Sequence, residues 1–306
     1  MSHPTLTILG FNSALPTTNS HPTAQLLEMA GHTFLIDCGE ATQVQIRKTG
    51  TKFSKIRHIF ISHLHGDHVF GLIGLISSLQ LMKTTPSLHI YGPKGIRDFI
   101  ENQLKHTKSE GNFPIHFVEL TSTQNEVIFE DEKIVVETIP LVHRIYTNGY
   151  FFKEKQKERS LVMEEIQKYP EIEICDYQNL KNGKDFVLSS GEILPNTLLT
   201  KDGPSPKSYA FCSDTRYKPK VCEQILGADL LYHEATFLHE LEEKAYATGH
   251  STALQAAMIA RDAKVKKLII GHFSTRYFPH YHRLQEEAQT VFPETCLPEL
   301  LEKVQF

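Results

Sequence analysis

The chain has 306 residues, 40% of them hydrophobic, and a formal net charge of −4 at pH 7. This length allows a large buried core, either as one big domain or as two smaller ones. The charge excludes a global electrostatic attraction to nucleic acid, so a polyanion would have to bind at a local patch or at metal ions. Residues 1–9 carry no signal-peptide pattern and no run of about eighteen apolar residues occurs, which predicts a soluble, cytoplasmic protein without a membrane partner.

The cysteines indicate a reducing compartment. An odd number of cysteines, scattered and without a CxxC pair, argues against a disulfide scaffold. The five are Cys38, Cys175, Cys212, Cys222 and Cys296.

Apolar segments in the first half of the chain predict alternating strands and helices. Strands are expected over residues 5–9, 24–29, 33–36, 56–61, 88–93, 115–120, 126–129 and 133–139. Helices are expected over residues 41–49, 71–81 and 95–106. Alternation of this kind predicts an α/β layered fold. Asp37, after the second strand of an expected hairpin, is either a turn residue or a support for a metal ligand.

The composition changes between residues 151 and 202. A mixed charge run over 153–159 and a short amphipathic helix over 160–169 predict an insertion or projecting arm, although a solvated face fits the charges equally well. The core then resumes with a helix over 253–263, capped by Ser251 or Thr252. Strands are expected over residues 208–212, 230–232 and 268–271.

The most informative stretch is residues 62–68, where an expected strand meets an expected helix. Four side chains that can bind metal lie there within six residues, and they are His63, His65, Asp67 and His68. Imidazole and carboxylate ligands suit zinc or another borderline divalent ion. Neither helical nor strand spacing directs all four at one ion, so we expect an irregular loop, turning at Gly66, that divides them between two neighbouring metals. The alternative is a solvated loop with incidental histidines.

Further polar side chains recur at the ends of expected strands. A lone histidine in such a place is a weak signal, but repetition predicts one site built from loops at one edge of a sheet. Besides His63 and His65, these residues are His143, Asp214, His233, Glu234 and His272.

These residues carry a resemblance to a known family. The string His63-Leu64-His65-Gly66-Asp67-His68 resembles the HxHxDH signature of metallo-β-lactamase-fold hydrolases, and residues 60–72 are similar to the ribonuclease Z branch, the tRNA 3′-processing endonucleases. The His-Glu-Ala-Thr and His-Ser-Thr strings separate this branch from lactamases and lactonases. Supporting segments occur in the family's order over residues 37–43, 213–215, 233–236, 250–252 and 271–277.

The resemblance implies a four-layer αβ/βα sandwich with a projecting arm: a single domain over residues 1–306, with residues 151–202 as an inserted tRNA-binding arm. It also implies two zinc ions per chain and a homodimer. The first zinc would be bound by His63, His65 and His143, and the second by Asp67, His68 and His272, with Asp214 bridging both.

The implied activity is cleavage of precursor tRNA after the discriminator base, which leaves a 3′-hydroxyl on the tRNA and a 5′-phosphate on the trailer. Asp67 would accept a proton from the attacking water, and His250, oriented by Glu234, would protonate the departing oxygen. A structural role for His250 and a supporting role for His233 stay open. The alternative functions are a small-molecule phosphodiesterase on the same metal site and a non-catalytic RNA-binding relative. The loop over residues 10–16 departs from the family's Gly-Thr-Ser-x-Gly-x-Pro pattern.

Overall fold

The chain folds into two compact units in a computed structural model. We name residues 1–153 and 207–306 the main unit and residues 154–206 the inserted unit. The described residues are 3–17, 20–82, 87–109, 111 and 113–306. Among them, no helix is long and apolar enough to cross a membrane.

The first sheet of the main unit has seven strands, the first six of the chain and the last one. The hairpin between its strands β2 and β3 turns at Ala30 and Gly31, both of which have positive φ, as the sequence predicts. From β3 to β6 the strands are parallel. In sheet order the strands are β18 (Lys303–Gln305), β1 (Thr5–Gly10), β2 (Ala24–Met29), β3 (His32–Ile36), β4 (Ile56–Phe60), β5 (Leu88–Pro93) and β6 (Ile115–Leu120).

The second sheet also has seven strands, and β14 to β17 run parallel. Phe151 and Phe152, which the sequence analysis assigned to the insertion, lie in β9 because they pair with Ala210 and Tyr209 of β14. The insertion therefore begins later than expected, at Glu154. In sheet order the strands are β17 (Thr295–Cys296), β16 (Leu268–Gly271), β15 (Leu230–Glu234), β14 (Ser208–Cys212), β9 (Asn148–Glu154), β8 (Ile134–Pro140) and β7 (Val127–Glu130).

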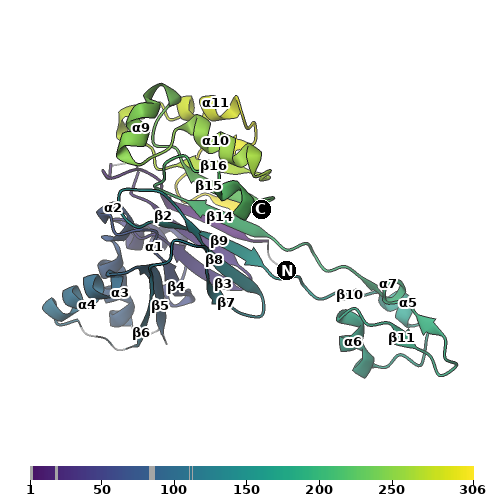
Figure 1. Cartoon of the computed structure of the whole chain (residues 1–306). Helices are drawn as coiled ribbons and strands as arrows, with labels where there is room; N and C mark the ends of the chain where they lie inside the picture. Colours follow the sequence, from purple (N-terminus) through teal and green to yellow (C-terminus); the bar gives the residue numbers. More distant parts are fainter. Residues whose placement is uncertain (1–2, 18–19, 83–86, 110, 112) are drawn as a thin grey trace. The chain divides into compact units, whose positions relative to one another are not determined.

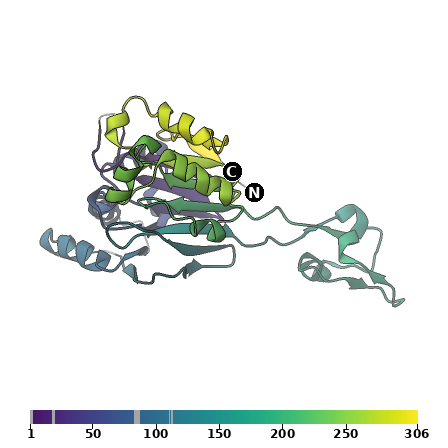
Figure 2. The same cartoon turned by 45° about the horizontal axis from the view of Figure 1, so that its top comes forward.

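The two sheets stack face to face with helices on both outer sides, which confirms the predicted α/β layers (Figures 1 and 2). Aromatic rings fill the space between the sheets: the Phe34 and Phe152 centroids lie 5.2 Å apart, as do those of Phe60 and Tyr150. Helices α1, α3 and α4 pack on the first sheet, and α8, α10 and α11 belong to the core of the second. The main-unit helices are α1 (Thr42–Thr49), α2 (Gly66–Val69), α3 (Leu72–Met82), α4 (Ile96–His106), α8 (Val221–Gln224), α9 (Glu242–Thr248), α10 (Ala253–Asp262) and α11 (His282–Gln289), with short 3-10 turns η1 (Phe53–Lys55), η3 (His239–Leu241) and η4 (Thr275–Tyr277).

The inserted unit has a small core of its own, although its sequence shows little apolar periodicity. Five buried aliphatic side chains form that core: Ile166, Ile172, Leu180, Leu194 and Leu199. The helix expected over residues 160–169 is shorter, because Ser160 and Leu161 form a strand instead. The elements are β10 (Ser160–Leu161), α5 (Met163–Ile166), η2 (Ile174–Asp176), α6 (Tyr177–Lys181), β11 (Phe186–Val187), β12 (Ile193–Leu194), α7 (Asn196–Leu199) and β13 (Thr200–Lys201).

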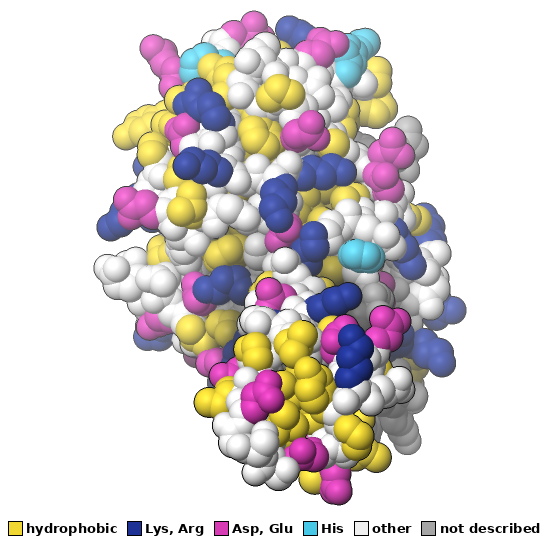
Figure 3. Space-filling model, turned by 90° about the vertical axis from the view of Figure 1, so that its right-hand side faces the viewer, with side chains coloured by type: hydrophobic (Ala, Val, Ile, Leu, Met, Phe, Trp, Pro, Cys, Tyr) yellow, Lys and Arg dark blue, Asp and Glu magenta, His cyan; other side chains and the backbone are white. Residues whose placement is uncertain are grey.

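The surface of the inserted unit carries exposed aliphatic side chains. Val187 and Ile193 face each other across β11 and β12 and are 59% and 61% exposed. Figure 3 shows hydrophobic side chains gathered among acidic ones on the face of this unit that is turned toward the viewer. The surface of the inserted unit is therefore not predominantly basic.

Candidate metal centre and active site

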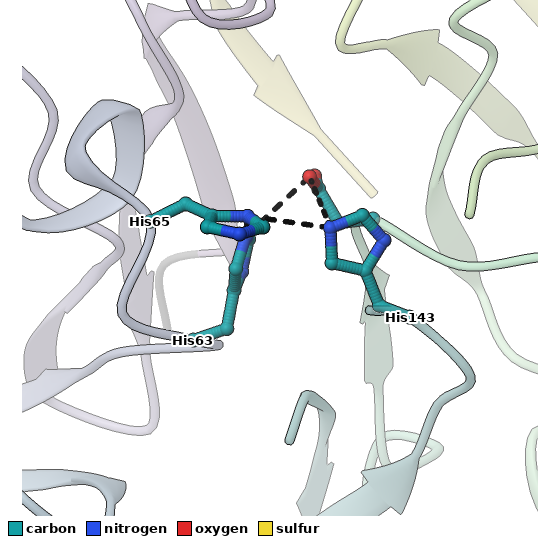
Figure 4. Close-up of side chains that lie close together, drawn as sticks. His63, His65 and His143 are labelled. Atoms are coloured by element: carbon teal, nitrogen blue, oxygen red, sulfur yellow. Dashed lines mark hydrogen bonds and ion pairs between the residues drawn. The ribbon is translucent and has the colours of Figure 1, made fainter. Parts of the chain in front are cut away.

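The polar side chains that follow the strands of both sheets meet in one place. His63, His65, Asp67 and His68 come after β4, and His143 lies in the loop after β8. Asp214 follows β14, Glu234 ends β15, and His272 follows β16. Figure 4 shows the rings of His63, His65 and His143 converging from two separate segments of the chain. The structure thus brings side chains that are more than 200 positions apart in the sequence, such as His63 and His272, into one site.

The loop expected around Gly66 is in fact one turn of helix, α2. His65 precedes it with extended backbone (φ −67°, ψ 146°), whereas Asp67 and His68 lie within the turn. The predicted irregular loop is therefore confirmed for residues 61–65 and wrong for residues 66–69. The backbone changes from extended at His65 to helical at Gly66, and this change separates His63 and His65 from Asp67 and His68. The dihedral angles are those of ordinary extended and helical residues.

The first group of potential ligands comprises His63, His65, His143 and Asp214, whose ligand atoms all lie within 4.8 Å of one another. Asp214 Oδ2 is 3.4 Å from His63 Nε2 and 3.7 Å from His143 Nε2. His63 Nε2 is 2.9 Å from His65 Nδ1. These atoms can surround one metal ion.

The second group comprises Asp67, His68 and His272, again within 4.8 Å. Here the other carboxylate oxygen of Asp214 faces the group: Oδ1 lies 3.3 Å from His68 Nε2 and 3.1 Å from His272 Nε2. Asp67 Oδ2 is 3.4 Å from each of the same two nitrogens. Asp214 therefore turns one oxygen toward each group.

The chemistry of these groups fits a pair of metal ions. Buried His68 Nε2 has no hydrogen-bond partner among the described residues and points at carboxylate oxygens. Burial alone would raise the pKa of Asp214, but the rings of His272, His68 and His63 hold it well below its usual range, so the carboxylate is ionised. Imidazole and carboxylate donors without a thiolate suit zinc and similar ions. Metal binding itself remains a prediction.

A layer of hydrogen bonds behind the histidines fixes their orientation. Asp37 is fully buried, and its Oδ2 accepts hydrogen bonds from His68 Nδ1 at 2.7 Å and from the Ser62 hydroxyl at 2.8 Å. His143 Nδ1 donates to the Gly249 carbonyl at 2.7 Å. Because such bonds set which nitrogen faces a metal, Asp37 acts as a support for a ligand, one of the two roles the sequence left open.

His250 and Glu234 form a buried pair beside the two groups. His250 Nδ1 lies 2.9 Å from Glu234 Oε1, and Glu234 is completely buried. Burial alone would lower the pKa of His250, but the Glu234 carboxylate raises it to about 9. Glu234 is held in turn by the backbone N–H of Thr215, at 2.9 Å, and by the Thr236 hydroxyl, at 2.6 Å. The Glu234 carboxylate therefore favours the protonated form of the imidazole.

The contacts of two nearby histidines, His250 and His233, bear on the roles predicted for them. Thr252 caps α10, in a capping box with Gln255, so the helix start does not require His250. His233 is buried and its Nδ1 donates to the backbone carbonyl of Glu234 at 2.7 Å, away from the ligand groups. His250, in contrast, shares a third group of ligand atoms with Asp214 and His272.

The ligand groups open into a cavity of about 680 Å³. Three of its lining residues, for which the sequence predicts no role, are Leu15, Phe70 and Arg144. The Ala14 backbone N–H donates to Asp67 Oδ2 at 2.9 Å, a contact that was likewise not predicted. A large aromatic residue two positions after the last histidine of the motif was the available signal for Phe70.

Comparisons with known proteins agree with this geometry. The sequence family described as Anti-Pycsar protein Apyc1 matches residues 4–168. Ribonuclease Z of Bacteroides thetaiotaomicron is 44% identical over 95% of this chain and 92% of its own length, and that of Porphyromonas gingivalis W83 is 43% identical over 94% of both.

Solved structures show the same fold. The short form of human tRNase Z matches with a TM-score of 0.71 and 28% identity over 98% of both chains. The metallo-β-lactamase fold protein YhfI of Bacillus subtilis matches with a TM-score of 0.68 and 17% identity over 100% of both chains. The predicted four-layer fold is thereby confirmed as the metallo-β-lactamase fold. The chain belongs to the Anti-Pycsar protein Apyc1 family through its first half and, over nearly its whole length, to the ribonuclease Z family.

Proposed function

We propose that this protein is a zinc-dependent endoribonuclease that removes the 3′ trailer from tRNA precursors, leaving a 3′-hydroxyl on the tRNA and a 5′-phosphate on the trailer. The observation that carries the proposal is the placing of Asp214, with one carboxylate oxygen toward each group of histidines at the base of an open cavity. The full-length relatives named ribonuclease Z and the human tRNase Z structure support the substrate.

Two zinc ions are the metals proposed. His63, His65 and His143 would hold one ion, Asp67, His68 and His272 would hold the other, and Asp214 would contribute to both sites. Bound there, the ions supply a water that loses its proton near pH 7 and positive charge for the scissile phosphate. This family of enzymes is metal-dependent, and the ligand atoms of both groups lie close enough for coordination after small movements.

The chain itself supplies the proton transfers. The rings of His68 and His272 offset the effect of burial and hold the pKa of Asp67 well below its usual range, so Asp67 stands ready as a carboxylate to accept the proton of the attacking water. The Ala14 N–H orients that carboxylate. His250, kept protonated by Glu234, donates a proton to the departing 3′ oxygen.

The inserted unit is proposed to contact the tRNA body. It contains ten acidic and seven basic side chains, which leaves a net charge of −3. Lys157, Arg159 and Lys168 pair with carboxylates of the unit. Among the described residues, Lys181 and Lys201 have no ion-pair partner, and their backbones lie beside residues 159 and 160. These two lysines are the proposed phosphate contacts.

The enzyme is further proposed to act as a homodimer in the cytoplasm. Exposed Val44 of α1 and Leu81 of α3, which are 52% and 83% exposed, give these contacting helices apolar surface that a second copy can cover. Free cysteines, as all five are, fit a reducing compartment.

The alternatives are less well supported. A small-molecule phosphodiesterase would use the same metal site, but the relatives that span the whole chain are named ribonuclease Z. A non-catalytic RNA-binding protein would have no need for seven potential ligands in two groups.

The direct test is to incubate the zinc-loaded protein with an end-labelled precursor tRNA that carries a 3′ trailer. We expect one cut after the discriminator base, abolished by a chelator and restored by zinc. Failure to cut, together with rapid hydrolysis of a small phosphodiester, would favour the small-molecule alternative instead.

Replacing Asp214 should remove metal and activity together. Because one carboxylate faces both groups, Asp214→Ala is expected to lose most bound zinc, as measured by mass spectrometry of the metal content, and all detectable cleavage. Asp262→Ala is the control, since Asp262 is exposed on α10. Two zinc ions per chain in Asp214→Ala would contradict the bridging assignment.

His250→Ala should keep both zinc ions and slow cleavage about 10²- to 10⁴-fold, the range for loss of a general acid. His106→Ala, at the exposed end of α4, serves as the matched histidine control. Cleavage at a near-normal rate would return His250 to a structural role. Loss of one zinc would make it a ligand, as its closeness to Asp214 and His272 permits.

Lys181→Glu and Lys201→Glu should each raise KM for precursor tRNA several-fold and weaken its salt dependence, because each removes a phosphate contact. Hydrolysis of a small phosphodiester should stay unchanged. Lys168→Glu makes the same charge change at a lysine that already pairs with Glu165. Equal effects from all three variants would mean that only the net charge of the inserted unit matters.

A further inference from the structure

An exposed aromatic ring stands at the mouth of the catalytic cavity and has no part in the proposed reaction. Phe70 is 60% exposed and lines the cavity together with Asp67 and His272. Single exposed apolar side chains are common, but Phe70 lines the cavity into which the ligand groups open, where a ring can contact a bound ligand.

The ring packs against two neighbours, Gly66 and Phe99. Phe70 follows α2, and its backbone N–H donates to the Gly66 carbonyl at 2.9 Å. The ring lies against Gly66 so closely that a Cβ there would clash with it. On another side the Phe99 ring stacks with it at 6.4 Å between centroids. A surface that is already ordered loses little freedom when it binds.

A second apolar side chain, Leu15, lines the same cavity and is 64% exposed. Its loop is tied to the site, because Ala14 donates to Asp67 and the Ser13 N–H donates to the Phe273 carbonyl at 3.2 Å. The lining of the cavity therefore includes apolar side chains, Leu15 and Phe70, in addition to the potential metal ligands.

The cavity also has a cation, Arg144, in a lining that includes the carboxylate of Glu40. Arg144 is exposed, lines the cavity and has no ion-pair partner among the described residues. A cation and apolar surface in one cavity match a nucleotide, which joins a phosphate to a flat base.

We infer that Phe70 and Leu15 form a nucleobase subsite that stacks one of the two bases flanking the scissile phosphate. This inference rests on the proposed function and names how its RNA is gripped next to the cut. Single-stranded RNA ends are commonly read in this way, because every base has a face that stacks on an aromatic ring.

The test pairs protein variants with RNAs that lack one base. Wild type and Phe70→Ala are compared on precursor tRNA, on RNA abasic at the discriminator position and on RNA abasic at the first trailer position. Phe70→Ala should lower kcat/KM on intact RNA roughly 5- to 100-fold, the range for losing one stacked base. Removal of one of the two bases should cost wild type a similar factor and cost Phe70→Ala nothing more.

Further variants separate stacking from structure. Phe70→Trp should keep most of kcat/KM, and Phe70→Leu should fall between Trp and Ala. Leu226→Ala, at an apolar side chain that is 62% exposed and does not line the cavity, should match wild type. Zinc content and circular dichroism of Phe70→Ala should be unchanged.

Each failure is distinguishable. If wild type does not cut precursor tRNA, the proposed function fails and the subsite fails with it. If wild type cuts and Phe70→Ala loses the same factor on every RNA, the ring acts on the metal centre and no base subsite exists. If Phe70→Ala cuts intact RNA as fast as wild type, the subsite is likewise overturned.

Discussion

The two groups of potential metal ligands depend on one buried carboxylate. Asp214 is only 2% exposed, and an isolated charge at such a place would be very unfavourable. It is tolerated because histidines face both of its oxygens. The backbone is also unusual at three residues of the site. Their φ angles are positive: 43° at Asp214, 57° at His272 and 56° at Asp37. Such left-handed conformations cost roughly 1–3 kcal/mol each and persist only where the surroundings enforce them.

The rest of the main unit supplies that enforcement. Parallel strands of the two sheets end at the same edge, so each delivers a side chain from a rigid base. The loops are then locked to each other: the Cys38 N–H donates to the His68 carbonyl at 2.8 Å, and the Gly71 N–H donates to the Cys38 carbonyl at 2.9 Å. A side chain on Gly71 would collide with the Gly39 carbonyl. The position of His68 is therefore set by backbone contacts as well as by Asp37.

Long apolar runs made the layers predictable from the sequence, and polar residues at strand ends made one shared site predictable, because both patterns are local. The membership of the two ligand groups was expected only from the family resemblance. The helical turn α2 was not predictable, since four residues give no period. Strand β9 was missed because its pairing with β14 is set by a segment more than fifty residues away. The link between Glu234 and His250 was expected from resemblance, but the raised pKa of the imidazole depends on a 2.9 Å contact with Glu234 that offsets the effect of burial, and only the structure gives that contact.

Electrostatics alone cannot account for RNA binding by this chain. Its net charge is −4, the inserted unit carries −3 of its own, and several cations there already have carboxylate partners. In the proposed function, phosphate recognition must then concentrate where charge is local, at the two metal ions and at Arg144, while apolar contacts supply the remainder. Stacking on a fixed ring is not screened by salt, whereas phosphate contacts weaken as counterions compete. Stacking of a base on this ring takes place next to the scissile bond, so it positions the phosphate as well as holding the RNA. Correct positioning of the phosphate lowers the barrier to in-line attack.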